Sequence, residues 1–413
     1  MKTRLALAAS AAALCICAGT VAAAHAPEAG AAQSTGLDTE KLQAALDAVH
    51  QAGVPGVFAE VRDADGTWRG ASGVADLDTG RPVRPGMRQR VGSVTKTFTA
   101  AAIMQQVEQG RIRLDAPIGD YLPQLVPGDR GRKITVRMLL NHTSGIADYI
   151  PYAFPSMVKH PHVPEMSPQS IDDNRFRHFE PAELIRLGLD APPATEPGAA
   201  KGVYSNTNYL LLGELLEHVS GVPAQEYITR NVIERAGLRH TGFPTTPYIE
   251  GPHPRMYESF FGKIDPPRDY SVYDGSWVGV SAGLVSTMAD LDRFFAQVLD
   301  GRIVSPSSLT EMQRTGPVVD LDGSTIQFGL GLVKVDVGCG TFWGKDGSAW
   351  GAGTISLIRA DGRRQMSVAI NLQRWNKPDA SGRLQPHPID GALTALYRQA
   401  MCGGGATDAE DAS

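Results

Sequence analysis

The sequence predicts an α+β fold, an α/β sandwich in which an antiparallel sheet is flanked by N- and C-terminal helices and carries a mostly helical inserted domain. Alternating apolar and polar residues occur near both ends of the chain, whereas the middle has the spacing and the termination signals of helices. If the terminal strands form one sheet, the helical middle is an insertion, and the cleft between the two parts is the natural place for a functional site.

Strand signals stand at both ends. Between residues 58 and 72, "FAEVR" and "TWRGAS" flank Asp63-Ala64-Asp65-Gly66, a sequence typical of a hairpin turn. Near the C-terminus, "FGLGLVKV", "TFWGKDG", "WGAGTISLI" and "RRQMSVAIN" are strand-like, and Asp361-Gly362 predicts a hairpin between the last two. We expect a helix from about Pro388 to Ala400 to close the fold.

Helix signals fill the middle. We expect "SVTKTFTAAAIMQQVEQG" to end at Gly110, "TVRMLLNH" to begin at the cap Thr135, "NYLLLGELLEHVSG" to end at Gly221 and "TMADLDRFFAQVLDG" to end at Gly301. Residues 150–178 and 243–275 lack a clean period, which favours loops that cover the cleft. His160 and His162 lack a third ligand, so we expect no metal.

The first residues resemble a secretory signal peptide. Lys2 and Arg4 precede an apolar stretch and small residues, with cleavage expected after Ala24 or Ala26. No later run reaches the roughly 18 apolar residues that a membrane span needs, so we expect a secreted chain, extracellular or on the cell-envelope side, without a span. The expected parts are a signal peptide (1–26), a sheet domain (37–95 and 288–402), a helical domain with cleft loops (96–287) and a disordered tail (403–413).

Charge and cysteine content narrow the partners and the covalent structure. Removal of Lys2 and Arg4 from the 39 basic residues leaves 37 against 44 acidic ones, a formal charge of −7, so we expect no nucleic-acid partner. Two of the four cysteines leave with the signal peptide. The remaining pair in an oxidising compartment predicts a bridge between Cys339 and Cys402; the alternative is two separate buried thiols.

Three separated motifs carry the chemistry. In "VGSVTKTFTA", Ser93 stands three residues before Lys96 at the start of a helix, so both lie on one helix face. "YSN" places Tyr204 and Asn206 just before another helix, and "KDG" places Lys345 and Gly347 on a predicted strand. With "LDAPIGDYLP", "ITVRMLLNHTSG", "PGAAKGVYSNTNYLLLG", "SAGLVSTMADLDRFF" and "FGLGL", in this order over about residues 37–402, the chain resembles the class C β-lactamase and serine D-alanyl-D-alanine carboxypeptidase group of penicillin-recognising hydrolases.

The resemblance implies a β-lactamase/transpeptidase-like fold and an acyl-enzyme on Ser93. Lys96 is its base, and its pKa must be lowered from about 10.4 by burial, by the helix start and by a second cation, for which Lys345 is placed. The resemblance also makes Tyr204 the proton carrier and puts the oxyanion donors at the backbone N–H groups of Ser93 and Ser348. It implies substrate contacts from Asn206, Lys345, Gly347 and Ser348.

Taken singly, each of these residues also has a structural explanation. Ser93 suits a helix cap, Lys96 a solvated face, Tyr204 loop packing and Asn206 the cap of the next helix. Jointly and in this order they favour catalysis. We interpret His142, in "NHTSG", as structural. Trp277 and Trp350 fit equally the lining of the cleft and ordinary core packing.

Asp346 departs from the family pattern, which often has Thr or Ser in the middle of this triad. Strand alternation puts Asp346 and Ser348 on one face, where the carboxylate would repel a substrate's terminal carboxylate by about 1 to 4 kcal/mol. Only Lys334 and Lys345 are obvious nearby cations. The reaction is therefore better defined by the sequence than the substrate.

We predict a secreted serine hydrolase without cofactor, D-alanyl-D-alanine carboxypeptidase-like and acting on peptidoglycan peptides. Its expected partner is a small-molecule or peptide substrate, and we expect a monomer. The alternatives in the same family are an esterase, a D-amino-acid peptidase or amidase, and a β-lactamase. A non-catalytic penicillin-binding sensor module is the alternative from another class, although the presence of Ser93, Lys96 and Tyr204 argues against it.

Overall fold

The computed structural model describes residues 36–157 and 166–403. The predicted signal peptide (1–26), the His160 and His162 pair and residues 404–413 of the predicted tail lie outside this part of the chain.

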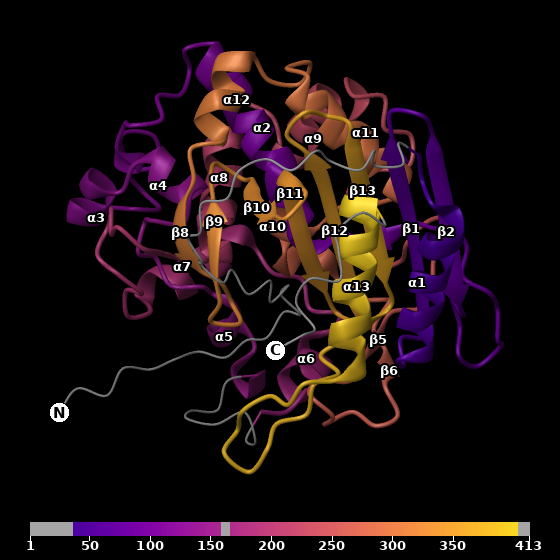
Figure 1. The fold of residues 1–413 in the computed structure, drawn as a ribbon. Helices are drawn as coiled ribbons and strands as arrows, with labels where there is room; N and C mark the ends of the chain where they lie inside the picture. The colour runs from indigo at the N-terminus through magenta and orange to yellow at the C-terminus, as the bar shows by residue number, and fades with distance from the viewer. Residues whose placement is uncertain (1–35, 158–165, 404–413) are drawn as a thin grey trace, which may run out of the picture.

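A nine-stranded sheet forms the centre of the molecule (Figure 1). Neighbouring strands are antiparallel, except that the last two in the order below are parallel. This confirms the predicted mainly antiparallel sheet built from both ends of the chain. Across the sheet, the strands are β2 (Thr67–Gly73), β1 (Gly56–Asp63), β13 (Arg364–Ile370), β12 (Ala352–Arg359), β11 (Gly340–Ala349), β10 (Val333–Val337), β9 (Thr325–Phe328), β8 (Gly316–Val319) and β4 (Gly202–Val203).

Helices cover both faces of this sheet. On one face, α1 (Thr39–Gln51) packs against α13 (Pro388–Cys402), and on the other α11 (Met288–Leu299) contacts β1, β12 and β13. Strand alternation explains the two layers, because Val57 of β1 belongs to the apolar cluster with α1 and α13, whereas Phe58 belongs to the cluster with α11. Figure 1 shows α1 and α13 in front of the strands.

The segment between the terminal strands is mostly helical. Its central helix α2 (Thr95–Glu108) is buried along most of its length and is joined to α11 by stacking of Phe98 on Phe294. Glycines with positive φ follow the predicted helix ends at Gly110, Gly221 and Gly301. The other helices are α3 (Gly128–Lys133), α4 (Val136–Leu140), α5 (Ile150–Ala153), α6 (Gln169–Asn174), α7 (Pro181–Asp190), α8 (Asn206–Ser220), α9 (Ala224–Ile228), α10 (Gly279–Ala282) and α12 (Pro306–Met312).

The two segments expected as loops contain short elements. In 150–178 the structure has α5 and α6, and in 243–275 it has two-residue strands, all too short to give a period in the sequence. These strands, β5 (Tyr257–Glu258) and β6 (Arg268–Asp269), form a small sheet with β14 (Leu372–Gln373), while β3 (Gln89–Arg90) pairs with β7 (Val285–Ser286).

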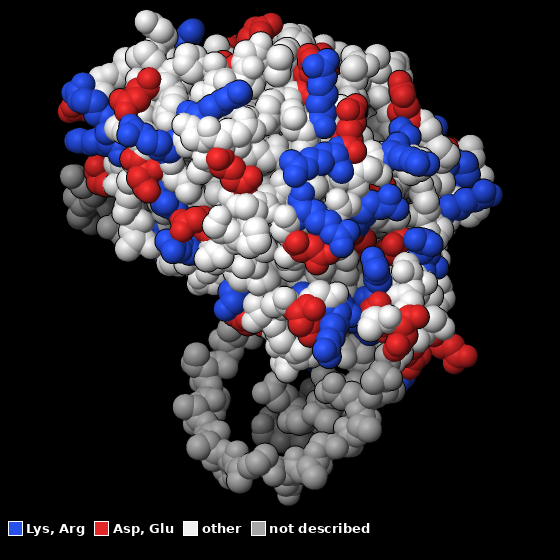
Figure 2. Space-filling view, turned by 90° about the horizontal axis from the view of Figure 1, so that it is seen from above, with Lys and Arg blue, Asp and Glu red and all other residues white. Residues whose placement is uncertain are grey.

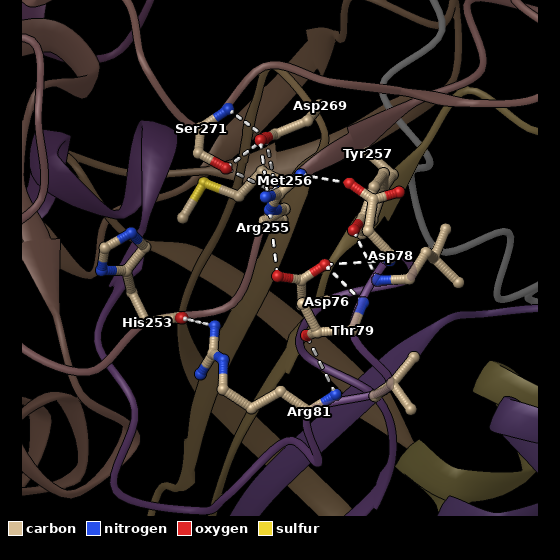
Figure 3. Close-up of polar contacts among 12 residues, drawn as sticks. Asp76, Asp78, Thr79, Arg81, His253, Arg255, Met256, Tyr257, Asp269 and Ser271 are labelled. Carbon is tan, nitrogen blue, oxygen red and sulfur yellow. Dashed lines mark hydrogen bonds and ion pairs between the residues drawn. The ribbon is translucent and has the colours of Figure 1, made fainter.

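An ion-pair cluster connects this small sheet with the segment that follows β2. Arg255 contacts the carboxylates of Asp76 at 3.2 Å, Asp78 at 2.7 Å and Asp269 at 3.8 Å, and Figure 3 shows Arg255 between Asp76 and Asp269. The Tyr257 hydroxyl also accepts a hydrogen bond from the backbone N–H of Leu77 at 2.7 Å. Because the charged and polar groups of these residues are paired with one another, we interpret this cluster as structural.

The predicted disulfide is present. Cys339 and Cys402 are bonded, with their Cα atoms 5.5 Å apart. Cys339 lies in the turn between β10 and β11, and Cys402 is the last residue of α13. The bridge therefore ties the C-terminal helix to the start of the strand that carries the "KDG" motif.

Charged side chains of both signs are interspersed on the face seen in Figure 2. Exposed pairs of this kind occur across the described surface, for example Arg314 with Glu311 at 2.9 Å. Each contributes about 0 to 1 kcal/mol to the free energy of unfolding. In the described ranges, no helix is both long and apolar enough to cross a membrane.

Candidate active site

Ser93 lies at the start of α2, where two glycines allow backbone segments to come very close. It belongs to a 3₁₀ turn, Gly92–Val94, that leads directly into the helix. Gly92 has φ +52°, and a Cβ atom there would lie 2.6 Å from the Ser348 backbone nitrogen. A Cβ atom on Gly347 would lie 2.6 Å from the Ser93 backbone nitrogen. Only glycine fits at either position, and the result is that the backbones of Ser93 and Ser348 lie against each other.

Lys96 is fully buried and makes three contacts through its ammonium group. Nζ lies 3.1 Å from Ser93 Oγ, 2.7 Å from Asn206 Oδ1 and 3.0 Å from the Ser281 carbonyl oxygen. The solvated helix face that was the alternative for Lys96 is therefore wrong, since the side chain is 0% exposed. When Lys96 is a neutral amine, its two N–H bonds can donate to Asn206 Oδ1 and to the Ser281 carbonyl oxygen, which are acceptors only. The nitrogen lone pair is then left to accept from the Ser93 hydroxyl.

The surroundings lower the pKa of Lys96. Burial is the main cause and the nearby charge of Lys345 is the second, and together they bring the pKa to about 7, although the carboxylates of Asp148, Asp320 and Asp346 act in the opposite direction. At neutral pH a large fraction of Lys96 is therefore unprotonated. This matches the expectation that burial and a second cation tune this lysine.

Asn206 is held by the carboxylate of Asp148, which no sequence motif marks. Asp148 Oδ2 accepts a hydrogen bond from Asn206 Nδ2 at 2.7 Å, and its Oδ1 accepts one from the backbone N–H of Ile150 at 3.0 Å. Because the NH₂ group of Asn206 points to Asp148, its carbonyl oxygen points to Lys96. Burial raises the pKa of Asp148, while its hydrogen bonds and the charge of Lys96 limit the rise.

Tyr204 lies beside both lysines. Its ring centroid is 4.9 Å from Lys96 Nζ and 5.5 Å from Lys345 Nζ. The side chain is buried, and its hydroxyl has no hydrogen-bond partner among the described residues. Burial, with a further contribution from the Asp320 carboxylate, raises the pKa of Tyr204 well above its usual value. The phenol is therefore protonated at neutral pH.

Lys345 and Asp346 form an ion pair, which changes the interpretation of both. Lys345 Nζ lies 2.5 Å from Asp346 Oδ1, although strand alternation would put neighbouring side chains on opposite faces. Burial alone would raise the pKa of Asp346, but the charge and the hydrogen bond of Lys345 hold it below its usual value. Asp346 is therefore paired with Lys345 and is not the free carboxylate that the sequence predicts.

A third carboxylate, also missed from the sequence, belongs to the β8–β9 turn. Burial and repulsion from Asp346 raise the pKa of Asp320 to about 6, and Lys345 counteracts this. This turn reaches the site because Tyr204 N–H donates to the Val319 carbonyl oxygen at 2.9 Å, next to the pairing of β4 with β8. Only tertiary structure brings Asp320 to the lysines, so no local motif predicts it.

Other residues singled out from the sequence lie apart from the reacting group. Trp277 and Trp350 stack on each other at 4.9 Å and are 6% and 3% exposed, which favours core packing over lining of the cleft. Lys334 pairs with Asp336 at 2.8 Å. Within the part of the chain that the structure describes, no group of three or more histidine, cysteine or acidic side chains is placed to hold a metal.

Comparison with known proteins places the chain among serine hydrolases. The model of the family described as Beta-lactamase matches residues 39–387. Penicillin-binding protein 4 of Amycolatopsis lactamdurans is 28% identical over 366 residues, 80% of this chain and 89% of that protein. Esterase EstB of Burkholderia gladioli is 31% identical over 216 residues, 50% of this chain and 53% of that protein.

A solved structure is similar over nearly its whole length. It is a D-stereospecific amidohydrolase from a Streptomyces species, with a TM-score of 0.74 and 31% identity, covering 89% of this chain and 99% of that one. The chain spans about half the length of EstB and of another curated relative, from Bacillus subtilis.

Proposed function

The chain belongs to the Beta-lactamase family of serine hydrolases, and within that family we propose that it hydrolyses amides or esters of D-amino acids through an acyl-enzyme on Ser93. The observation that carries the substrate class is the ion pair between Lys345 and Asp346, at 2.5 Å. It leaves neither active-site lysine as a free cation for a substrate carboxylate.

In the proposed acylation step, Lys96 takes the proton of Ser93 Oγ as this oxygen attacks the substrate carbonyl. The contacts of Lys96 with Asn206 and Ser281 support this direction of transfer, because they use its N–H groups and leave its lone pair for Ser93. The oxyanion that forms would receive hydrogen bonds from the N–H groups of Ser93 and Ser348. One such donor contributes about 2.7 to 4 kcal/mol to lowering the barrier.

Expulsion of the leaving group requires a proton, and Tyr204 is the proposed donor. Its raised pKa keeps the phenol protonated until the carbon–nitrogen or carbon–oxygen bond breaks. The resulting phenolate would lie close to two cations and recover a proton from Lys96. Water then attacks the acyl-enzyme by the same route, which releases the acid and restores Ser93.

The charges around the site support a substrate with a free amine. Three carboxylates, those of Asp148, Asp320 and Asp346, act on two lysines, one of which must be neutral to serve as a base. The net charge of this group is then negative. A substrate ammonium is attracted to such a site and a terminal carboxylate is repelled.

The relatives agree with amide or ester hydrolysis but differ in substrate. The solved relative at 31% identity is a D-stereospecific amidohydrolase, and EstB is an esterase. A D-alanyl-D-alanine carboxypeptidase, expected from the sequence, would have to bind a terminal carboxylate without a free lysine. We therefore rank it, the β-lactamase and the acylating sensor module below the amidase or esterase.

The test compares D-alanine amide, its L enantiomer, N-acetyl-D-alanine amide, D-alanyl-D-alanine, an aryl ester of D-alanine and a chromogenic cephalosporin. We expect turnover of the D-amide and the D-ester, with loss of rate on N-acetylation. Faster hydrolysis of D-alanyl-D-alanine than of the amide would contradict the proposal. A stable cephalosporin adduct without turnover of any substrate would favour the sensor module.

Two further properties remain proposals based on the sequence. We propose that residues 1–26 direct export and are removed, and that the mature chain is a monomer. N-terminal sequencing of the secreted protein and light scattering test these two points separately.

A further inference from the structure

His142 is a buried histidine that contacts the segment carrying Tyr204 in several ways. Its side chain is 0% exposed and its ring centroid lies 4.1 Å from that of Tyr204. Its Nδ1 accepts a hydrogen bond from the backbone N–H of Ser205 at 3.2 Å. Its carbonyl oxygen accepts one from the backbone N–H of Val203 at 3.1 Å. The residues on both sides of Tyr204 are thus bonded to His142, and the Tyr204 ring packs against the imidazole.

The hydrogen bond from Ser205 fixes the form of the imidazole. Because a backbone N–H can only donate, Nδ1 must be the acceptor, and the proton of the neutral ring lies on Nε2. Burial and the charges of Lys96 and Lys345 lower the pKa of His142 well below its usual value, so the ring is neutral at physiological pH. A neutral ring adds no positive charge beside the Tyr204 phenol.

This arrangement has two energetic costs. His142 has φ +61°, in the left-handed region that residues other than glycine rarely adopt. Its Nε2 is buried without a hydrogen-bond partner among the described residues. Such costs are found where the surrounding structure holds a residue in place for a function.

We propose that His142 is a positioning residue that holds the Tyr204 phenol against the leaving group of the substrate. The proposal rests on the proposed function, in which Tyr204 is the proton donor. We place His142 outside the reacting group because it contacts Tyr204 and the neighbouring Ser205, whereas Lys96 contacts Ser93 directly. Phe328 contacts both rings from the side, at 4.7 Å from His142 and 5.9 Å from Tyr204, and completes the packing.

Substrates with different leaving groups distinguish a positioning role of His142 from a merely structural one. An alkyl ester or amide must receive a proton as its bond breaks, whereas p-nitrophenolate leaves without one. Loss of Tyr204 alignment should therefore slow the amide and the alkyl ester and spare the p-nitrophenyl ester. A general loss of folded enzyme would slow all three equally.

Two substitutions of His142 remove its ring and its hydrogen-bond acceptor separately. His142→Asn keeps an acceptor near the position of Nδ1 and tolerates positive φ, but it removes the ring. His142→Phe keeps a ring and removes the acceptor for Ser205 N–H. We expect the ratio of kcat/KM for the ethyl ester of D-alanine to that for its p-nitrophenyl ester to fall about 10- to 100-fold in His142→Asn. His50→Asn changes a remote histidine on α1 and should leave the ratio unchanged.

The decisive comparison is a double-mutant cycle with Tyr204→Phe. If His142 acts through Tyr204, then His142→Asn should not change the ester ratio further in the Tyr204→Phe background. Independent, multiplying effects would overturn the proposal, as would equal losses on both esters in the single variant.

A crystal structure of His142→Asn gives a readout that does not depend on activity. We expect the Tyr204 ring to move or to occupy more than one conformation. An unmoved, well-ordered Tyr204 would overturn the positioning role even if the wild-type enzyme hydrolysed none of these substrates. By contrast, a Tyr204→Phe enzyme with an unchanged ester ratio would refute the proton-donor role, and thus the proposed mechanism, separately.

Discussion

Asp148 accepts a hydrogen bond from the side-chain amide of Asn206 at 2.7 Å, and the carbonyl oxygen of the same amide lies 2.7 Å from Lys96 Nζ. A carboxylate can only accept, so it determines which end of Asn206 faces the lysine. The orientation of the proposed base therefore depends on a residue that does not contact it directly.

Replacing Asp148 tests this dependence. In Asp148→Asn the Asn206 amide can turn its NH₂ group toward Lys96, and we expect kcat/KM to fall about 10- to 100-fold. The negative charge of Asp148 raises the pKa of Lys96, so its removal should also move the acid limb of the pH profile to lower pH. Asp47→Asn, on α1, is the control. A lower kcat/KM with an unchanged acid limb would count against the inference that the charge of Asp148 raises the pKa of Lys96.

The pH dependence of the wild-type enzyme should reflect Lys96. Only unprotonated Lys96 can take a proton from Ser93, and its pKa is about 7, so kcat/KM should fall as the pH decreases through about 7. Lys345→Met removes a like charge and should raise the pKa of Lys96, which moves the acid limb to higher pH. Stopped assays from pH 5 to 9 measure both profiles, and a shift to lower pH in Lys345→Met would be inconsistent with this assignment.

Ser93→Ala should abolish acylation and preserve the fold. Loss of a residue at a helix start costs at most about 2 kcal/mol. Intact-mass measurement after incubation with an activated D-alanine ester or a β-lactam should detect an adduct on the wild-type protein alone. An adduct on Ser93→Ala would place the nucleophile elsewhere.

The parts of the site that the sequence predicted are those encoded by local spacing. Ser93 and Lys96 are one helical turn apart, and the glycine in "KDG" lies where the strand passes close to Ser93. Helix ends at Gly110 and Gly221 were predictable for the same reason, because glycine adopts positive φ without strain. Each of these features depends only on residues that lie close together in the sequence.

The parts that were missed depend on contacts between distant segments. Asp148 and Asp320 approach the lysines from a loop and from a turn that no short motif marks. The pairing of Lys345 with Asp346 contradicts simple strand alternation, since long side chains of neighbouring residues can still meet around a strand. Sequence spacing predicts which residues face one another along an element, but not how their charges pair in three dimensions.

Removal of the disulfide should destabilise the protein. Cys339 and Cys402 are separated by 63 residues, and closing a loop of this size contributes about 4 kcal/mol to the free energy of unfolding in the chain-entropy model. Cys402→Ser should lower the midpoint of chemical denaturation. Addition of reductant to the wild-type protein should lower its midpoint toward that of the variant. Equal midpoints for the variant and the oxidised wild type would show that the bridge does not stabilise the fold.

Asp346→Asn should change the preference of the enzyme between charged and neutral substrates. The variant loses the carboxylate that pairs with Lys345, so the lysine becomes a free cation and a repelling charge disappears. We expect kcat/KM for D-alanyl-D-alanine to rise relative to that for its C-terminal amide. An interaction of about 1 to 4 kcal/mol corresponds to roughly fivefold to almost a thousandfold, with the lower end expected in a wet cleft.

Salt distinguishes a charge effect from a change in shape. If the gain in Asp346→Asn comes from attraction between Lys345 and the substrate carboxylate, it should shrink as ionic strength increases, because the screening length is about 8 Å at 0.15 M and about 3 Å at 1 M. A neutral ester of D-alanine serves as the matched control. Should the dipeptide and the ester respond equally and independently of salt, Asp346 would act on the geometry of β11, and the preference for amine-bearing substrates would lose its electrostatic basis.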